Sequence, residues 1–274
     1  MTRHRRLHHR LTLDGCGKDI ALAWRALRRT PGFTVVAVLT LGIGIGVNAV
    51  VFTVTNAVLF KGFPLVRGND RLVYMTSGPG CCVSYPDFED WRAQATSFDG
   101  MALVHGMPIT LADASGFAER YDATEVSAET FALVGQRPVL GRDFTVDDEA
   151  PGAAPVAILR YGFWERRFGG DPGVLGRTLR VNGVPTTIIG VMPPGFSFPQ
   201  NQDAWPPLVN TADVLRRDVR NTWFVVGRLA DGITRERARA EMETIGRRLG
   251  NAYPETNQGR NLLPYVLTFE EFFI

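Results

Sequence analysis

The sequence lacks the signatures by which many enzymes are recognised. It contains no G-x-x-x-x-G-K-[ST] loop, so the chain does not supply an ATPase of its own. It has no G-x-S-x-G nucleophile elbow, and His105 is its only histidine after residue 60. No cysteine or carboxylate spacing around His105 is typical of a metal site or a nucleophile–base pair. We therefore expect a protein that is not an enzyme, and we assign no catalytic, cofactor-binding or metal-binding residue.

Charge is missing from residues 33–60, which contain no Asp, Glu, Lys or Arg. A helix of this length, at about 1.5 Å per residue, exceeds the roughly 30 Å of bilayer hydrocarbon. Its polar residues are uncharged and scattered rather than gathered on one face. The stretch predicts a transmembrane helix. Gly42 and Gly46, with Asn48 nearby, suggest a face for a second helix, although a glycine-rich span without a fixed partner is the alternative.

A competing motif lies in the same stretch. Residues 44–49 fit the G-x-G-x-x-G/A fingerprint of dinucleotide-binding domains. That motif requires an acidic residue about 20 positions later and a helix with a polar face. No acidic residue occurs between Asp19 and Asp70, and the sequence stays apolar through Phe60. The nucleotide-binding interpretation is therefore disfavoured.

The flanking charges predict an orientation. Residues 1–30 are net +6, whereas residues 61–274 are net −4. The positive-inside rule places the N-terminus in the cytoplasm and the residues after 60 outside the bacterial inner membrane. A cleaved signal peptide has an apolar region of about 7–15 residues, so an uncleaved anchor fits better. Residues 19–29 have the spacing of an amphipathic helix at the membrane surface, and we expect the first ten residues to contact anionic lipid rather than to bind a metal.

Two polar features after the span receive structural explanations. Asp87, Glu89 and Asp90 begin a predicted helix at residues 84–95, capped by Ser84, and the helix dipole explains them better than acid–base chemistry does. Cys16 is expected to be reduced in the cytoplasm, whereas Cys81 and Cys82 lie in an oxidising compartment. Adjacent cysteines rarely bridge each other, so we expect exposed thiols or intermolecular pairing.

Periodicity predicts an α+β fold after the span. Residues 71–105 form a β-α-β unit, and strands at residues 221–229 and 262–268 flank a helix at residues 234–252. The helix is expected to carry Arg237–Glu241 and Glu243–Arg247 pairs on its outer face. Between these parts, short strands alternate with helices at residues 127–135 and 161–168, and Asn182-Gly183 marks a hairpin in residues 177–191. Phe163, Trp164 and Phe168 are expected in the core.

The sequence therefore predicts five parts. These are a cytoplasmic tail and interfacial helix (1–32), a transmembrane helix (33–60), the first half of a βαβ-rich periplasmic lobe (61–108), an inserted β-rich lobe (109–220), and the second half of the first lobe (221–274).

Four long motifs, at residues 19–59, 126–144, 155–199 and 225–242, resemble the MacB/FtsX-type ABC transporter permeases, and more narrowly the orphan permeases of the duplicated type first noted in acidobacteria. The resemblance covers about residues 18–260. It implies a first helix, a periplasmic core of two lobes and three further membrane helices. Residues 260–274 contain no second apolar stretch of about 18 residues, so we expect a truncated or frame-shifted permease.

The resemblance implies a non-catalytic permease component that couples a cytoplasmic ABC ATPase, MacB- or LolD-like, to periplasmic movement in export or mechanotransmission. Membrane lipid and a second permease copy are further expected partners, whereas nucleic acid is not. An anchored binding module without transport activity is the alternative, and an anchored hydrolase is a third class.

Overall fold

The computed structural model describes residues 24–25, 27–59, 65–78, 82–112, 118–220, 223–257, 264–268 and 271–272. The chain divides into two compact units, Met1–Val58 and Leu59–Ile274. The predicted basic tail lies outside the described residues, as does most of the predicted interfacial helix. The described part of that helix is helical, and the Arg28 guanidinium lies 5.1 Å from the centre of the Trp24 ring.

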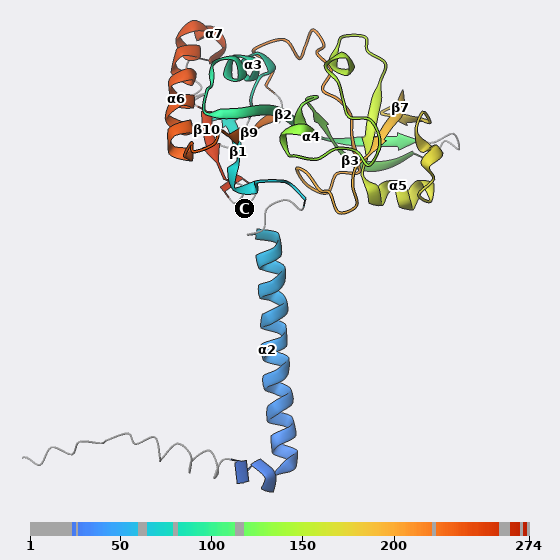
Figure 1. The fold of residues 1–274 in the computed structure, drawn as a ribbon, viewed down its shortest axis with the longest axis vertical. Coiled ribbons are helices and arrows are strands. Elements are labelled where there is room, and N and C mark those ends of the chain that lie inside the picture. Colours follow the sequence, from blue (N-terminus) through green and yellow to red (C-terminus); the bar gives the residue numbers. More distant parts are fainter. Residues whose placement is uncertain are drawn as a thin grey trace, which may run out of the picture. The chain divides into compact units, whose positions relative to one another are not determined.

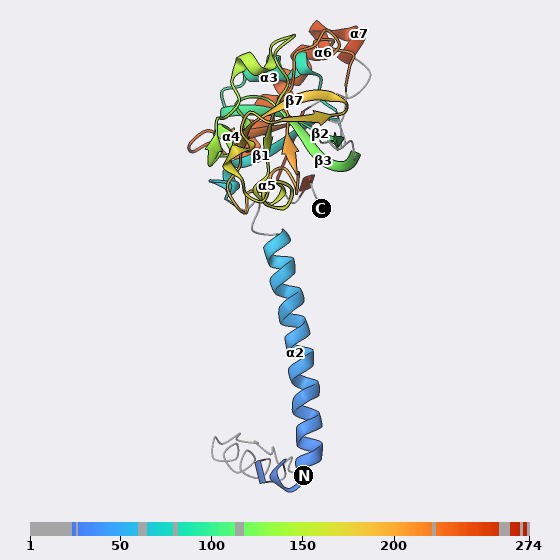
Figure 2. The same ribbon diagram turned by 90° about the vertical axis from the view of Figure 1, so that its right-hand side faces the viewer.

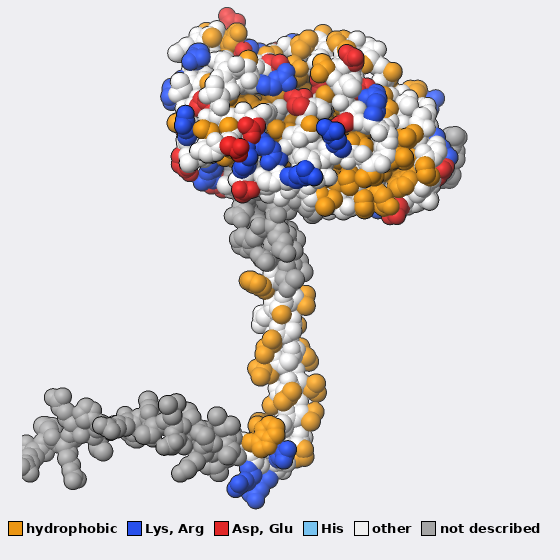
Figure 3. All heavy atoms as spheres, viewed as in Figure 1, with side chains coloured by type: hydrophobic (Ala, Val, Ile, Leu, Met, Phe, Trp, Pro, Cys, Tyr) orange, Lys and Arg blue, Asp and Glu red, His pale blue; other side chains and the backbone are white. Residues whose placement is uncertain are grey.

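The first unit contains the long helix α2 (Pro31–Leu59), which confirms the predicted helix. Its segment Pro31–Phe52 is the one helix among the described residues that is long and apolar enough to cross a membrane. Large apolar side chains are exposed along α2 from Phe33 to Phe52, and Figure 3 shows apolar side chains on both edges of the helix in that view, as expected for a surface that meets lipid. Residues 44–49 lie inside this continuous helix, so the strand–turn–helix that a dinucleotide site requires is not formed there.

The second unit is built on a sheet with the order β10-β1-β9-β2-β3-β8-β5-β7-β4, and β6 pairs with β2 and β7. The strands are β1 (Leu72–Ser77), β2 (Phe98–Ala112), β3 (Ala118–Val126), β4 (Leu140–Gly141), β5 (Val156–Leu159), β6 (Thr178–Val181), β7 (Val184–Val191), β8 (Ala204–Trp205), β9 (Trp223–Leu229) and β10 (Pro264–Leu267). The helices are α3 (Tyr85–Gln94), α4 (Thr130–Leu133), α5 (Tyr161–Phe168), α6 (Arg235–Ala252) and α7 (Pro254–Asn257), with short 3-10 turns η1 (Asn69–Arg71), η2 (Val146–Glu149) and η3 (Pro172–Val174).

Two interleaved β-α-β units form one end of this sheet. β9 is antiparallel to both β1 and β2, and β1 is antiparallel to both β9 and β10. Each predicted β-α-β unit is therefore present, with a strand of the other unit between its own two strands. The order β10-β1-β9-β2 is that of a ferredoxin-like β-α-β-β-α-β motif. The chain between β2 and β9 is the inserted part.

Helices α3 and α6 lie on the same side of these four strands (Figure 1 and Figure 2). The apolar spacing predicted for α6 is confirmed, because Ala238, Met242, Ile245 and Leu249 are all buried. They pack with Phe88 and Trp91 of α3. On the outer face Glu243 contacts Arg239 and Arg247, but Glu241, expected to pair with Arg237, instead accepts hydrogen bonds from Thr96 and Ser97.

The inserted part confirms the predicted hairpin and α5. Asn182 and Gly183 have φ values of 49° and 82°, so the turn between β6 and β7 has the left-handed geometry of a type I′ hairpin. Phe163 and Trp164 are buried, and Phe168 packs against the same cluster. The helix predicted at residues 127–135 is shorter than expected, because only α4 is helical. The Ser127 hydroxyl accepts a hydrogen bond from the Leu103 amide, which holds residue 127 against β2.

Strand β2 joins the inserted part to the ferredoxin-like part. Its first half, from Phe98 to His105, pairs with β9, whereas Val104 to Ala112 pairs with β3. The predicted lobe boundary at residues 108/109 falls inside this continuous strand, and the division into two lobes stays a prediction. A shared aromatic core reinforces the link, since Tyr74 and Val226 lie in one cluster with Phe131 and Trp205.

Candidate functional site: a buried ion cluster

Among the described residues, the groups most able to react are dispersed. No group of three or more His, Cys, Asp or Glu side chains among them is arranged to hold a metal ion. His105 faces Glu125 across the β2–β3 ladder, with Nδ1 at 2.8 Å from Oε2. This contact is a half-buried cross-strand pair.

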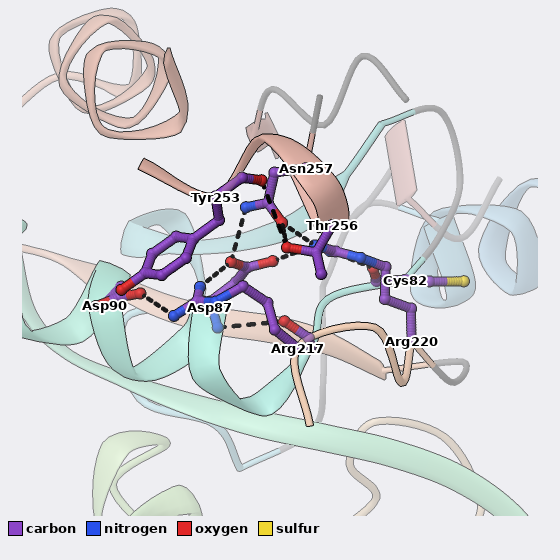
Figure 4. Close-up of polar contacts among 9 residues, drawn as sticks. Cys82, Asp87, Asp90, Arg217, Arg220, Tyr253, Thr256 and Asn257 are labelled. Carbon is purple, nitrogen blue, oxygen red and sulfur yellow. Dashed lines mark hydrogen bonds and ion pairs between the residues drawn. The ribbon is translucent and has the colours of Figure 1, made fainter. Parts of the chain in front are cut away.

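A group of buried charges surrounds Asp87 in the first turn of α3 (Figure 4). The side chain of Asp87 is only 3% exposed. One carboxylate oxygen accepts a hydrogen bond from the Arg217 guanidinium, and the other lies 2.6 Å from Nη2 of Arg220. Nη2 of Arg217 also donates to Asp90 at 2.6 Å. The cluster thus balances two guanidinium groups against two carboxylates.

Helix α7 contributes further hydrogen bonds to the cluster. The Asn257 amide donates to Asp87 at 3.0 Å and accepts from Arg220 at 2.8 Å. The Thr256 hydroxyl donates to the same Asn257 oxygen at 2.9 Å. Arg220 also donates to the carbonyl of Cys82 at 3.5 Å. Three segments that are distant in sequence therefore meet at one carboxylate: α3, the segment 209–220 that leads back from the inserted part to β9, and α7.

Stacking fixes the position of Arg217. Its guanidinium carbon lies 3.7 Å from the centre of the Tyr253 ring, a cation–π geometry. Burial by itself would lower the pKa of Arg217, but the bonds to Asp90 and Asp87 outweigh it and raise that pKa.

Three side-chain donors engage the carboxylate of Asp87, two at Oδ1 and one at Oδ2. The predicted cap is present, because the Ser84 hydroxyl accepts from the Asp87 amide at 3.3 Å. The helix dipole alone, however, does not explain why Asp87 and Asp90 are acidic. Their side chains pair with Arg217 and Arg220. These two arginines lie in an irregular segment, where no periodic pattern in the sequence predicts their positions.

The expectation of a free thiol is wrong for Cys82, which is disulfide-bonded. Its φ of 140° is one of three positive values among the described residues other than glycine. Cys16 and Cys81, the only other cysteines, lie outside the described residues. The backbone carbonyl of Cys82 accepts from Arg220, so the backbone of Cys82 contacts the ion cluster, while its sulfur points away from it (Figure 4).

Comparisons with known structures agree with this fold. The periplasmic region of MacB from Actinobacillus actinomycetemcomitans matches 75% of this chain and 94% of its own length, at 13% identity and a TM-score of 0.55. The extracellular domain of the noncanonic ABC-type transporter YknZ from Gram-positive bacteria matches 72% of this chain and 99% of its own length, at 13% identity and a TM-score of 0.52. A domain of a protein described as a permease from Porphyromonas gingivalis matches 77% of this chain and 95% of its own length, at 16% identity and a TM-score of 0.57.

No curated protein matches the sequence significantly. A family model does match it, over residues 34–245. The matched region begins inside α2 and ends inside α6, so it contains most of the apolar helix, the ferredoxin-like strands β1, β2 and β9, and the whole inserted part. The chain belongs to the family of MacB-like periplasmic core domains found in ABC transporter permeases.

Proposed function

We propose that this protein is the membrane-anchored periplasmic core of an ABC transporter permease, that it performs no covalent chemistry, and that it couples a cytoplasmic ATPase to periplasmic movement. The observation that carries the proposal is the extent of the family match, which includes both the apolar helix and the domain after it. One family model thus matches both the apolar helix and the domain after it. The proposed coupling to a cytoplasmic ATPase needs both parts.

The proposed orientation follows from charge. Residues 1–30 are net +6, and the positive-inside rule keeps such a segment in the cytoplasm. Residues after 60 then lie on the periplasmic side. The proposed partners are a MacB- or LolD-like ABC ATPase on the cytoplasmic side, the surrounding lipid and a second copy of the permease.

The proposed mechanism transmits force through rigid contacts. β2 pairs with β9 in the ferredoxin-like part and with β3 in the inserted part. The Asp87 cluster connects α3 to the segment 209–220 and to α7. Packed cores and buried ion clusters switch between discrete arrangements rather than deform continuously. A displacement at the anchor would therefore move the two proposed lobes, residues 61–108 with 221–274 and residues 109–220, as bodies.

The test is ATPase coupling. The full chain is reconstituted in nanodiscs with candidate MacB- and LolD-like ATPases, and ATP hydrolysis is measured with and without it. We expect one ATPase to bind and its rate to change when the chain is present. The chain with Arg217→Gln should bind equally but alter the rate less, whereas Arg216→Gln, in an exposed neighbour that pairs with Asp218, should behave like the wild type.

Two results would contradict the proposal. If no ATPase responds and the domain binds a small molecule or peptide, the protein is an anchored binding module. If the purified full chain turns over substrates in an esterase, peptidase or glycosidase panel, and an inhibitor of that activity labels it, the protein is an enzyme.

A further inference from the structure

A second group of charges lies where α3 meets the inserted part. We call the contacts between α3 and residues 127–149 the seam. Arg92 of α3 donates through Nη1 to Glu129 at 2.7 Å and through Nη2 to Glu89 at 2.8 Å. One guanidinium therefore bridges its own helix and the residue that precedes α4.

Glu149, the last residue of η2, is the buried member of the seam. It is 7% exposed, and its Oε1 accepts a hydrogen bond from the Ala128 amide at 2.5 Å. Its backbone carbonyl accepts from the Asn210 backbone amide at 2.8 Å, and its charge acts on the pKa of Tyr85 in α3. Glu149 thus lies where α3, the turn at residues 127–129 and the segment 209–220 converge.

The seam holds more negative than positive charge. The charged or titratable groups that face Glu149 are Tyr85, Glu89 and Arg92 from α3 and Glu129 from the turn before α4. On its own turn, Asp148 is engaged by Arg142, and Asp147 is exposed. Arg92 therefore pairs with Glu89 and Glu129, and Glu149 adds a third carboxyl close enough to feel its charge.

Burial is the main reason why the pKa of Glu149 is raised to about 7. The Ala128 amide and Arg92 oppose the rise, while Glu129 and Glu89 add to it. A carboxyl whose pKa is higher in the folded than in the unfolded protein stabilises the fold in acid. That contribution is lost as the pH rises from the ordinary 4.5 toward 7.

We propose that Glu149 is a proton-operated latch in the seam, which holds α3 against residues 127–149 when its carboxyl is neutral and loosens that contact when it ionises. Loss of the proton places a third negative charge beside one guanidinium in a poorly solvated site, and repulsion from Glu89 and Glu129 then favours separation. A cleft of about 700 Å³ runs beside the seam and is lined by Arg92, Glu129 and the exposed Val146. It leaves space beside the contacts that would separate when the seam opens.

The latch extends the proposed function, because it would make the contact between the two proposed lobes respond to the pH outside the cytoplasm. It does not depend on the ATPase. The chain alone is therefore enough to test it, and its failure would leave the proposed coupling intact.

The first test follows the carboxyl directly. Infrared difference spectra of the full chain in detergent are recorded between about pH 5 and pH 8.5, across the expected midpoint of about 7. We expect a protonated carboxyl band that disappears near this midpoint and is missing from Glu149→Gln. The control, Glu165→Gln on the exposed side of α5, should retain the band. A band with the same titration in wild type and Glu149→Gln would overturn the proposal.

The second test asks whether the seam opens. Amide exchange is compared at each pH between wild type and Glu149→Gln, which cancels the intrinsic effect of pH on exchange. We expect residues 127–134 and 85–94 to exchange faster in the wild type above the midpoint and equally below it. Equal exchange at every pH would overturn the latch.

Two charge variants keep the proposal testable if Glu149→Gln does not fold. Glu129→Gln removes a like charge and frees Arg92, so it should lower the midpoint by roughly one pH unit. Arg92→Gln removes the guanidinium and should raise the midpoint by a similar amount. An unchanged midpoint in both variants would show that the band does not belong to Glu149 in this seam.

Discussion

Asp87 and Arg220 are 133 positions apart in the sequence, yet their side chains lie 2.6 Å apart and are 3% and 6% exposed. Removing one member of a buried ion pair leaves an uncompensated charge, which typically costs about 3–5 kcal/mol. The pair therefore fixes where the chain returns from the inserted part to β9. It is the contact through which we expect displacement to pass between the two parts.

Arg217→Gln should destabilise the domain by about 3 kcal/mol, because it leaves Asp90 unpaired and withdraws one of the donors of Asp87. Arg216→Gln should change the unfolding free energy by less than about 0.5 kcal/mol, since its partners Asp213 and Asp218 are exposed. Thermal unfolding of the full chain in detergent measures both variants. Equal melting temperatures would show that the cluster does not hold the segment in place.

Two glycine substitutions should act in opposite directions. Gly183→Ala should cost about 1 kcal/mol, because Gly183 has a φ of 82° in the hairpin turn although no atom lies within 4 Å of the added methyl group. Gly162→Ala should stabilise α5 by about 0.5–1 kcal/mol, because Gly162 is helical and its methyl group would meet only the mobile end of Arg166, at 3.4 Å. Chemical denaturation of each variant tests the pair, and a stabilising Gly183→Ala would contradict the assigned turn.

Asp148 should give the opposite pH effect from its neighbour Glu149. The bidentate Arg142 guanidinium is the main cause of its lowered pKa, and hydrogen bonds from Thr145 lower it further. Its stabilising contribution is therefore complete above the ordinary aspartate pKa and is lost as the pH falls. Asp148→Asn should lower the melting temperature near neutral pH, and its difference from wild type should shrink in acid.

The exposed neighbour Asp147 provides the control for this measurement. Asp147→Asn should have the same melting temperature as the wild type across the same pH range. A gap between Asp148→Asn and wild type that widens in acid would mean that Arg142 does not stabilise the ionised carboxyl.

Arginine in α2 should disrupt membrane anchoring. Leu41→Arg combined with Ile45→Arg places two charges on one face of the helix. Each charge raises the free energy of membrane insertion by about 2.5–3.5 kcal/mol near the membrane centre. Thr30→Arg, in the basic flank, is the matched control. We expect alkaline extraction to release the double variant and to leave wild type and Thr30→Arg in the membrane pellet. Retention of the double variant would argue against α2 as the anchor.

Local signals were enough to predict much of the fold. The uncharged stretch predicted α2, Ser84 predicted the start of α3, and Asn182-Gly183 predicted the turn between β6 and β7. Each of these features is decided by residues within a few positions of one another. The apolar spacing of α6 likewise identified its buried face.

The ion cluster and the seam could not be predicted in this way. Asp87 meets Arg217 and Arg220 only because the inserted part brings residues 209–220 back beside α3. Glu149 is buried in the folded domain, whereas in the sequence it ends an ordinary acidic run. The partners are 130 and 133 positions apart at Asp87 and 21 and 37 positions apart in the seam, so they leave no periodic trace and depend on the tertiary fold.

The most direct measurement is amide exchange over residues 209–220 in the full chain, reconstituted with its ATPase in nanodiscs. Exchange is compared without nucleotide, with ATP, and with ATP and an ATPase that cannot hydrolyse it. The account predicts that protection of this segment changes between nucleotide states, and that Arg217→Gln removes the change while Arg216→Gln preserves it. Identical exchange in every nucleotide state, with the ATPase bound and active, would contradict coupling through this domain.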